Sequence, residues 1–247
     1  METTNKVAQI TLIFWLMKII ATTLGETFGD FLSMTLQLGY GLSLGITAAT
    51  FLIVLLWQLS RNRYVPPIYW LVIIATTTLG TEISDFIDRS LHLGYTGGSV
   101  LLLGGLLGAL AYWHRKFGSL AVYPIVKRDK EIIYWIAILF SNSLGTAFGD
   151  YLSDVAGLTY WQGALVTAGV ILVVILLHYA SRINEVWLFW LAFVFTRPFG
   201  ATFGDLLTKP VAKGGLDLGT LPASVVAVSL LGVLLLGNQL RRRTAVS

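Results

Sequence analysis

The chain has 247 residues, of which 55% are hydrophobic and only 12% are charged. Soluble domains are on average about half apolar and about a quarter charged, so this composition excludes an ordinary soluble enzyme, a nucleic-acid-binding module and a disordered linker. The formal net charge is +4, but the basic residues stand in short clusters between apolar runs, which indicates topology rather than a nucleic-acid partner. Cysteine is absent, which excludes disulfides, thiolate metal sites and thiol catalysis.

Eight apolar segments are each long enough to cross a bilayer, for which a helix needs about 20 residues. In chain order, we expect spans near residues 8–34, 42–59, 67–89, 98–113, 131–154, 163–180, 185–208 and 219–239. Gly/Tyr-rich turns, such as residues 38–41 and 94–98, join the two spans of a pair. The first segment carries Glu26 and Asp30 and has no small-residue cleavage site, so we expect a retained span rather than a signal peptide.

The basic clusters between the spans predict the orientation. They are Arg61 and Arg63; His114, Arg115 and Lys116; Lys127, Arg128 and Lys130; Arg182; and Arg241, Arg242 and Arg243. With eight spans, every cluster falls on the same side of the membrane as both termini. The positive-inside rule makes this side cytoplasmic. The lipid bilayer is therefore the expected surrounding, and both termini are expected in the cytoplasm.

One motif occurs four times along the chain. Each copy runs from a Trp to an Asp without a gap, over residues 15–30, 70–85, 135–150 and 190–205. Such self-similarity is typical of repeat architectures, and four like hairpins share one orientation. The sequence therefore predicts an all-α membrane protein with eight transmembrane helices, built from four tandem two-helix repeats with pseudo-symmetry about the membrane normal. The expected hairpins are 1–60, 61–120, 121–181 and 182–247, whose halves 1–120 and 121–247 form a single integral membrane domain.

The first helix of every repeat carries small residues four positions apart. They are Gly25 and Gly29, Gly80 and Ser84, Gly145 and Gly149, and Gly200 and Gly204. This spacing lets helix backbones approach closely in lipid. We expect these helices to pack around a common axis, whereas the second helices, which are almost free of charge, form a lipid-facing ring.

The same four helices carry a polar stripe, because residues about one turn apart share a helix face. It consists of Thr22, Glu26, Asp30 and Ser33; Thr77, Thr81, Asp85 and Asp88; Asn142, Thr146, Asp150 and Ser153; and Arg197, Ala201, Asp205 and Thr208. Glu82 lies about a turn deeper than the Asp column. Ionisable groups inside a membrane cost roughly 2.5–3.5 kcal/mol each and normally face a bundle interior or a water-filled cavity. The nearby positive charges in sequence are Lys18, which is expected to snorkel to the surface, and Arg197.

The ligand types in this stripe indicate a cation. Carboxylates, hydroxyls and amides suit Mg²⁺, Ca²⁺, Mn²⁺, Na⁺ or protons, rather than copper or zinc. We expect Asp30, Asp85, Asp150 and Asp205 to bind the metal ion, and no covalent cofactor. The path is expected to include Glu26, Glu82, Thr22, Thr77, Asn142 and Arg197. The Asp column could instead form an external vestibule, or each Asp could bond a neighbouring helix end or tyrosine and only stabilise the repeat.

Arg197 departs most from the repeat, because the other copies carry Thr22, Thr77 and Asn142 at this position. Pro198 follows it and would weaken or kink the helix. We expect an ion pair with Glu26 or with one of the aspartates. An internal counter-ion that releases an acid when substrate binds, and an anion-binding group, are the alternatives.

The repeated Gly-x-x-x-Gly-Asp hairpins resemble an uncharacterised family of bacterial multi-pass inner-membrane proteins, over nearly the whole chain. This resemblance implies the bacterial inner (plasma) membrane. Residues 26–33 are also loosely similar to cation/proton exchangers with a Glu-x-Gly-Asp-(Lys/Arg)-(Ser/Thr) motif, but have one extra residue before Gly29 and no basic residue after Asp30. That second resemblance implies export of manganese or calcium coupled to protons.

The leading hypothesis is a non-enzymatic transporter or channel for a small inorganic cation, as a monomer or a homodimer. A scaffold or sensor that transports nothing is an alternative, in which the repeat is purely architectural. An intramembrane aspartyl protease is a third hypothesis, but Thr27, Ala147 and Thr202 replace the first glycine of its Gly-x-Gly-Asp motif. Four equivalent aspartates also exceed the pair that such an enzyme needs.

Overall fold

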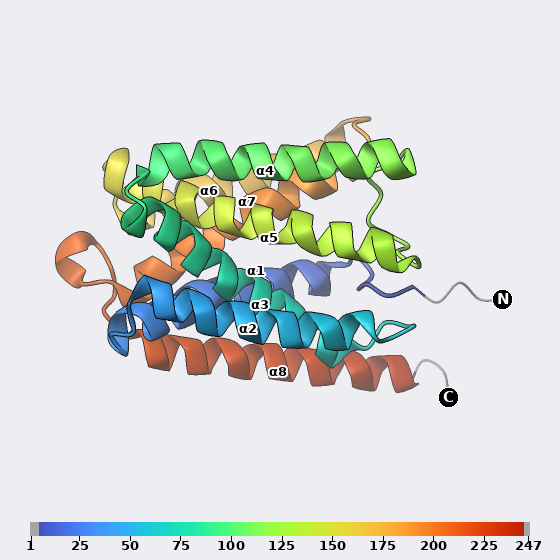
Figure 1. Cartoon of the computed structure of the whole chain (residues 1–247), viewed down its shortest axis with the longest axis horizontal. Coiled ribbons are helices and arrows are strands. Elements are labelled where there is room, and N and C mark those ends of the chain that lie inside the picture. Colours follow the sequence, from blue (N-terminus) through green and yellow to red (C-terminus); the bar gives the residue numbers. More distant parts are fainter. Residues whose placement is uncertain (1–4, 245–247) are drawn as a thin grey trace.

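The computed structural model describes residues 5–244, and the side chains of residues 5–240. In this part of the chain, eight long helices run between the same two ends of one bundle (Figure 1). They are α1 Leu12–Asp30, α2 Gly39–Leu59, α3 Pro66–Asp85, α4 Gly94–Phe117, α5 Arg128–Asp150, α6 Tyr160–Ala180, α7 Glu185–Thr208 and α8 Thr220–Thr244. Each is long and apolar enough to cross a membrane, so the predicted multi-pass fold of eight spans is confirmed.

The odd-numbered helices form an inner ring. α1 packs against α3 and α7, and α5 packs against the same two helices from the opposite side. Each outer helix covers the inner helix of the next repeat: α2 packs on α3, α4 on α5, α6 on α7, and α8 closes the ring on α1. The inner helices bury 56–72% of their apolar windows within the protein, and the outer helices 17–28%, so the outer helices present most of the surface to lipid.

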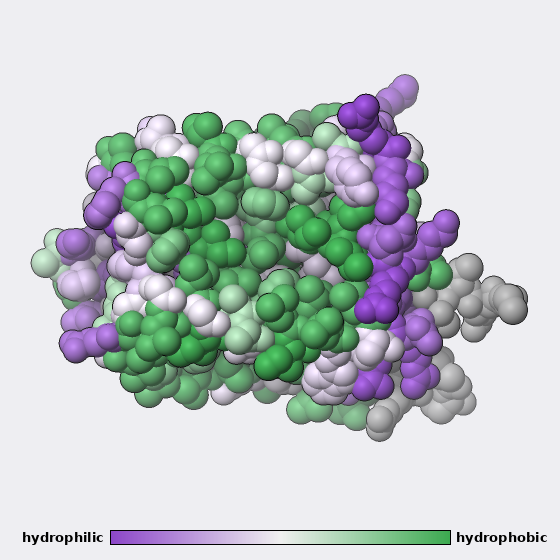
Figure 2. Space-filling view, in the orientation of Figure 1, coloured by the Kyte–Doolittle hydropathy of each residue, from purple (hydrophilic) through white to green (hydrophobic). Residues whose placement is uncertain are grey.

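The two ends of the bundle differ in their surfaces. Both described chain ends lie at one end, here called the terminal end, together with the connections 60–65, 118–127 and 181–184 (Figure 1). Hydrophilic residues gather at both ends, most densely at the terminal end, and a broad hydrophobic belt covers the middle of the bundle (Figure 2). The opposite end, here called the distal end, holds the connections 36–38, 91–93, 156–159 and 209–219. The predicted cluster at Arg241, Arg242 and Arg243 lies outside the residues whose side chains are described.

Local chemistry moves several helix ends from their expected positions. α1 begins at Leu12 rather than near residue 8, because the Thr11 hydroxyl accepts a hydrogen bond from the Phe14 backbone N–H at 3.2 Å. The Gly/Tyr-rich stretches expected as turns are mostly helical. Gly39 and Gly94 start α2 and α4 with φ of 71° and 66°, a conformation that glycine adopts without strain. The chain therefore reverses within residues 36–38 and 91–93.

Each of the first three inner helices ends in a π-helical turn directly after the aspartate of the repeated motif, at Phe31–Thr35, Phe86–Ser90 and Tyr151–Val155. The Leu36, Leu91 and Ala156 N–H groups close these wide turns with hydrogen bonds of 2.8–2.9 Å to the carbonyls five residues earlier. The fourth repeat differs, because α7 continues to Thr208 and a longer connection, residues 209–219, follows it. π-Helical turns are frequent at functional sites. The repeat is thus least regular at the distal end.

Glycine brings the inner helices into close contact. The first small residue of each repeat packs against the first polar column of the neighbouring helix, and the pairs are Gly25 with Thr77, Gly80 with Asn142, Gly145 with Arg197, and Gly200 with Thr22. A Cβ atom at Gly25 would lie 2.5 Å from the Thr77 Cβ, so only glycine fits. Gly29, Gly149 and Gly204 lie in the same way against Thr81, Ala201 and Glu26. The four contacts follow one another around the ring.

Aromatic side chains fill the ring near the terminal end. The Tyr69 and Tyr134 hydroxyls are 2.6 Å apart, and both rings are buried. Trp113 and Trp190 pack edge to face with ring centroids 5.6 Å apart. Beside this layer, the buried Glu131 carboxylate accepts from the Lys6 ammonium and, at 2.9 Å, from the Gln58 amide. The inner ring is therefore closed on this side by packed aromatic groups.

Candidate functional site

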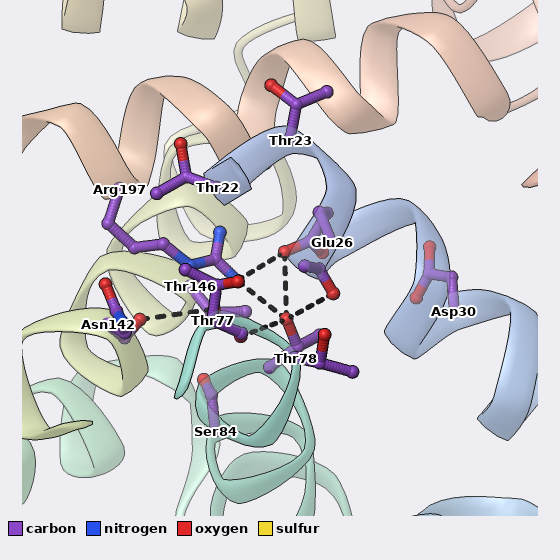
Figure 3. A network of polar contacts seen from close by, with 12 residues as sticks. Thr22, Thr23, Glu26, Asp30, Thr77, Thr78, Ser84, Asn142, Thr146 and Arg197 are labelled. Carbon is purple, nitrogen blue, oxygen red and sulfur yellow. Dashed lines mark hydrogen bonds and ion pairs between the residues drawn. The ribbon is translucent and has the colours of Figure 1, made fainter. Parts of the chain in front are cut away.

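A buried ion pair lies at the centre of the inner ring. Arg197 of α7 donates from Nη2 to Glu26 of α1 at 2.9 Å and to the Thr81 hydroxyl of α3 at 2.6 Å. Figure 3 shows the guanidinium directed at Glu26 from the neighbouring helix, with Asp30 one turn further along α1. Arg197 is fully buried and Glu26 is 3% exposed. Of the arrangements considered for Arg197, the structure holds the pair with Glu26.

Lys18 also points into the bundle rather than to its surface, contrary to the expectation that it snorkels. Its ammonium donates to the Asn142 side-chain oxygen at 3.0 Å and lies 4.2 Å from the centre of the Phe193 ring. Asn142 in turn donates to the Thr76 hydroxyl at 3.1 Å. The physical reason is that Asn142 and the Phe193 ring supply an interior partner for the charge. Lys18 thus links α1 to α5 across the ring.

Thr22 and Thr77, both expected in the path, bond the backbone of neighbouring helices. The Thr77 hydroxyl donates to the Ala21 carbonyl at 3.0 Å, and the Thr22 hydroxyl to the Thr196 carbonyl at 3.3 Å. Each hydroxyl also donates to a carbonyl three residues earlier in its own helix. In the described structure these two residues form hydrogen bonds between neighbouring inner helices.

The four aspartates of the repeated motif form two pairs, and each pair is bridged by a cation. The Lys209 ammonium lies 2.5 Å from an Asp30 oxygen and 3.4 Å from an Asp205 oxygen. Arg89 lies 3.1 Å from an Asp150 oxygen and 3.5 Å from an Asp85 oxygen. The Lys209 bridge connects the fourth repeat to the first, and the Arg89 bridge connects the second repeat to the third. The two cations therefore compensate half of the formal negative charge of the four aspartates.

Sequence reasoning missed both of these cations, because it counted only Lys18 and Arg197 as nearby positive charge. A signal was present, since Arg89 and Lys209 each stand four residues after the aspartate of their own repeat. Groups four apart meet on a helix surface. The first and third repeats carry Met34 and Asp154 at this position. Repeats two and four thus supply the cations, and repeats one and three do not.

Two tyrosines hold Arg89 in place. The guanidinium donates to the Tyr40 hydroxyl at 2.8 Å and to the Tyr95 hydroxyl at 3.2 Å. Tyr95 donates onward to Asp154 at 2.8 Å. The tyrosines that follow the inner helices therefore contact Arg89 and Asp154, whereas an expected alternative had them bonded to the repeated aspartates. The Arg89 bridge is therefore held by two further hydrogen bonds, to tyrosines of α2 and α4.

Lys209 lies just beyond the end of α7, and its environment keeps it charged. Burial disfavours the charged form, but the Asp205 and Asp30 carboxylates outweigh burial and hold the pKa of Lys209 well above its usual range. Its side chain is 21% exposed and also lies 3.8 Å from the Met34 sulfur. The neighbouring carboxylates thus favour the charged form of Lys209 at the distal end of the site.

A cavity of about 320 Å³ lies beside both bridges at the distal end. We call it the vestibule, and it is lined by Met34, Arg89, Asp150, Ser153, Asp154, Tyr160, Asp205, Lys209, Pro210 and Lys213. Both bridging cations and one aspartate of each pair line it. The vestibule therefore reaches two of the repeated aspartates, Asp150 and Asp205, at the distal end.

Three of the expected site residues converge between α1 and α7. Glu26, Asp30 and Asp205 each place a carboxylate oxygen within 4.8 Å of the others, and all three side chains are buried. Glu82 of α3 is adjacent, because its Oε1 would lie 3.4 Å from a Cβ atom built on Gly29. Glu82 is fully buried, and neither of its carboxylate oxygens has a hydrogen-bond partner among the described residues. Asp85 and Asp150 instead belong to the Arg89 pair.

Each of the four hairpins matches one repeat of a known family. Four segments, residues 13–64, 68–118, 133–184 and 188–244, match the model of a family described as Repeat of Unknown Function (DUF347). The four matches coincide with the four helical hairpins. No curated protein and no solved structure matches the chain. The repeat is thus identified, and its function has to be argued from the buried charges.

Proposed function

Because the chain belongs to the DUF347 repeat family, whose name assigns no activity, we propose a function from the geometry of the site. The protein is a transporter for a small inorganic cation of the Mn²⁺, Ca²⁺, Mg²⁺ or Na⁺ class, exchanged against protons. It resides in the bacterial inner membrane with both termini in the cytoplasm, so the vestibule faces outward. The carboxylates between α1, α3 and α7 bind the ion.

Glu82 is the observation that carries this proposal. A fully buried carboxylate without a partner is among the most costly groups in a membrane protein, unless it holds a proton or a cation. Glu26, Asp30 and Asp205 lie beside it, so a cation there would meet several oxygen ligands. A group that must bind either a proton or a cation is suited to exchange one for the other.

The different closure of the two ends supports a transporter rather than an open channel. The vestibule reaches Asp150 and Asp205 from the distal end. The packed aromatic layer around Tyr69 and Tyr134 closes the ring toward the terminal end. A bundle that is open to one side of a central site is the geometry of one state in alternating access. The close glycine contacts between inner helices would allow repeats to move against one another as rigid bodies.

Reconstitution into liposomes tests the proposal. Purified protein should carry Mn²⁺ into vesicles that contain a Mn²⁺-quenched dye, and uptake should depend on a pH gradient. Glu82→Gln should abolish this uptake, because the amide cannot exchange a proton for a cation. Asp129→Asn is the matched control, since this acid is half exposed at the terminal end and should leave uptake unchanged.

The other functions predict different outcomes. A scaffold or sensor would give no flux of any cation in the panel of Mn²⁺, Ca²⁺, Mg²⁺ and Na⁺, and this result would contradict the proposal, as would unchanged uptake in Glu82→Gln. An aspartyl protease needs two aspartates that share a proton. Here Lys209 lies between Asp30 and Asp205, and Arg89 between Asp85 and Asp150, which disfavours such a pair.

A further inference from the structure

We infer that Lys209 occupies, as a tethered ammonium group, a divalent-cation site formed by Glu26, Asp30, Asp205 and Glu82, and that an incoming divalent cation displaces it. This inference rests on the proposed function and makes it specific. It assigns the substrate class and names the residue that competes with the substrate. It also gives the two cation bridges different roles. The bridge at Lys209 is a binding site, and the bridge at Arg89 is a structural contact.

The donor geometry is that of an oxygen site for a hard cation. The carboxylate oxygens of Glu26, Asp30 and Asp205 already lie within 4.8 Å of one another. Ca²⁺ and Mn²⁺ bind several carboxylate oxygens at little more than 2 Å, so a shared ion would need only small side-chain movements. The unpartnered Glu82 carboxylate lies against Gly29, between Glu26 and Asp30 along α1, and lies outside the group of three. A side-chain movement toward Glu26 and Asp30 would add it as a fourth ligand from α3.

The charges around the site favour a divalent over a monovalent ion. With Lys209 displaced, Arg197, which is paired with Glu26, is the cation in direct contact with one of the four carboxyl groups. Arg89, which also acts on Glu82, is already bridged to Asp85 and Asp150. A divalent ion leaves much less negative charge uncompensated than a monovalent one, and uncompensated charge is costly inside a protein. Lys18 does not contribute, because it lies eight residues from Glu26, about 12 Å along α1, and pairs with Asn142.

Lys209 can leave the site without unfolding a helix. It stands in the connection 209–219, directly after α7, with an extended backbone. Its side chain lines the vestibule, so its ammonium can move into water while its backbone stays in place. Its N–H still bonds the Asp205 carbonyl at 2.8 Å, which keeps the residue anchored to the helix end. The vestibule is thus both the route for the ion and the space for the displaced ammonium.

The pseudo-symmetric bridge at Arg89 lacks the additional acids. Arg89 lies between Asp85 and Asp150, as Lys209 lies between Asp205 and Asp30. The repeat places Thr146 and Thr202 where the Lys209 site has Glu26 and Glu82. Two tyrosine hydroxyls also fix the Arg89 guanidinium. The same bridge therefore occurs twice, but only the one at Lys209 has Glu26 beside its two aspartates, with Glu82 next to Glu26 across Gly29.

The experiment is a Mn²⁺ titration of the purified full-length protein in detergent, with free Mn²⁺ measured by electron paramagnetic resonance. Lys209→Met should lower the Kd for Mn²⁺ by at least about tenfold, because it removes a positive charge from the ion's position. Arg89→Met is the matched comparison and should change the Kd much less than Lys209→Met, because Arg89 is bonded to Asp150 and to two tyrosine hydroxyls rather than to the proposed ligands. Glu82→Gln and Asp205→Asn should weaken binding by at least about tenfold, since each removes a ligand.

Three results would overturn the inference: Mn²⁺ binds no variant, Arg89→Met tightens binding as much as Lys209→Met, or Lys209→Met leaves the Kd unchanged. Lys209→Gln serves as a second charge-removing variant, and a cooperative thermal transition shows that each variant is folded. Vesicle flux separates this inference from the proposed function. If Mn²⁺ binds as described but no variant carries it into vesicles, transport alone is refuted. If flux depends on Glu82 but Lys209→Met has the same Kd as the unchanged protein, the displacement alone is refuted.

Discussion

Arg197 illustrates how a single residue organises the interior. It connects α7 to Glu26 of α1 and Thr81 of α3, and its side chain is fully buried. Its Nε and Nη1 atoms have no hydrogen-bond partner among the described residues. A buried charge pair with incomplete hydrogen bonding contributes little net stability, but the loss of one member leaves an isolated charge.

We therefore expect Arg197→Met to lower the free energy of unfolding by about 3–5 kcal/mol, because Glu26 remains buried without the counter-ion that it contacts directly. The double variant Arg197→Met with Glu26→Gln should recover most of this loss. Denaturant titration in detergent measures both. A double variant that is no more stable than Arg197→Met would mean that Arg197 stabilises the bundle through packing rather than through Glu26.

The identity of the polar stripe could be predicted from the sequence, but its pairings could not. The repeated motif predicted that Glu26, Glu82 and the four aspartates lie inside the bundle, because acids in membrane helices normally face the interior. Which groups meet depends on the rotation and height of each inner helix relative to the next. Arg89 and Lys209 show this, since each reaches the aspartate of another repeat. A single sequence contains no such relation between helices.

At the scale of helices, the close packing of the inner ring depends on residues without side chains. Gly200 of α7 faces the Thr22 hydroxyl and backbone of α1 with no room for a Cβ atom. At Gly169 of α6, by contrast, no neighbouring atom lies within 4 Å of where a Cβ atom would be. The two glycines therefore separate the effect of steric overlap from that of helix propensity.

Gly200→Ala should lower the free energy of unfolding by about 1–3 kcal/mol, because the added methyl group forces α7 away from α1. Gly169→Ala should be neutral or slightly stabilising, since alanine is the better helix former and the space is open. Thermal denaturation in detergent compares them. Equal melting temperatures for the two variants would show that the ring tolerates separation at this contact.

The helices themselves were predictable because they are long and apolar, whereas their ends were not. All eight expected spans correspond to helices of the structure. The Gly/Tyr-rich turns were placed too late, since Gly39 and Gly94 already begin α2 and α4. The π-helical turns could not be predicted from the hydrophobic pattern, because the same residues could equally continue an α-helix. The wide turns follow from backbone geometry, not from composition.

For the whole molecule, the proposed orientation can be checked with introduced cysteines, because the chain has none of its own. Val211 is 69% exposed in the distal connection, and Ser119 is exposed at the terminal end. In intact bacteria, a membrane-impermeant maleimide should label Val211→Cys but not Ser119→Cys, which should react only after permeabilisation. The reverse pattern would place the vestibule in the cytoplasm and invert the direction of transport.

The cyclic packing of the inner helices also bears on how such a protein can arise. Two identical half-chains could close the same ring, since each outer helix covers the inner helix that follows it. A homodimer of the second half would then hold two copies of Arg197, each facing Thr146 instead of Glu26. A homodimer of the first half would hold Lys18 twice and Arg197 not at all. The central ion pair therefore requires two halves that have diverged, and covalent fusion guarantees that one of each is present in every ring.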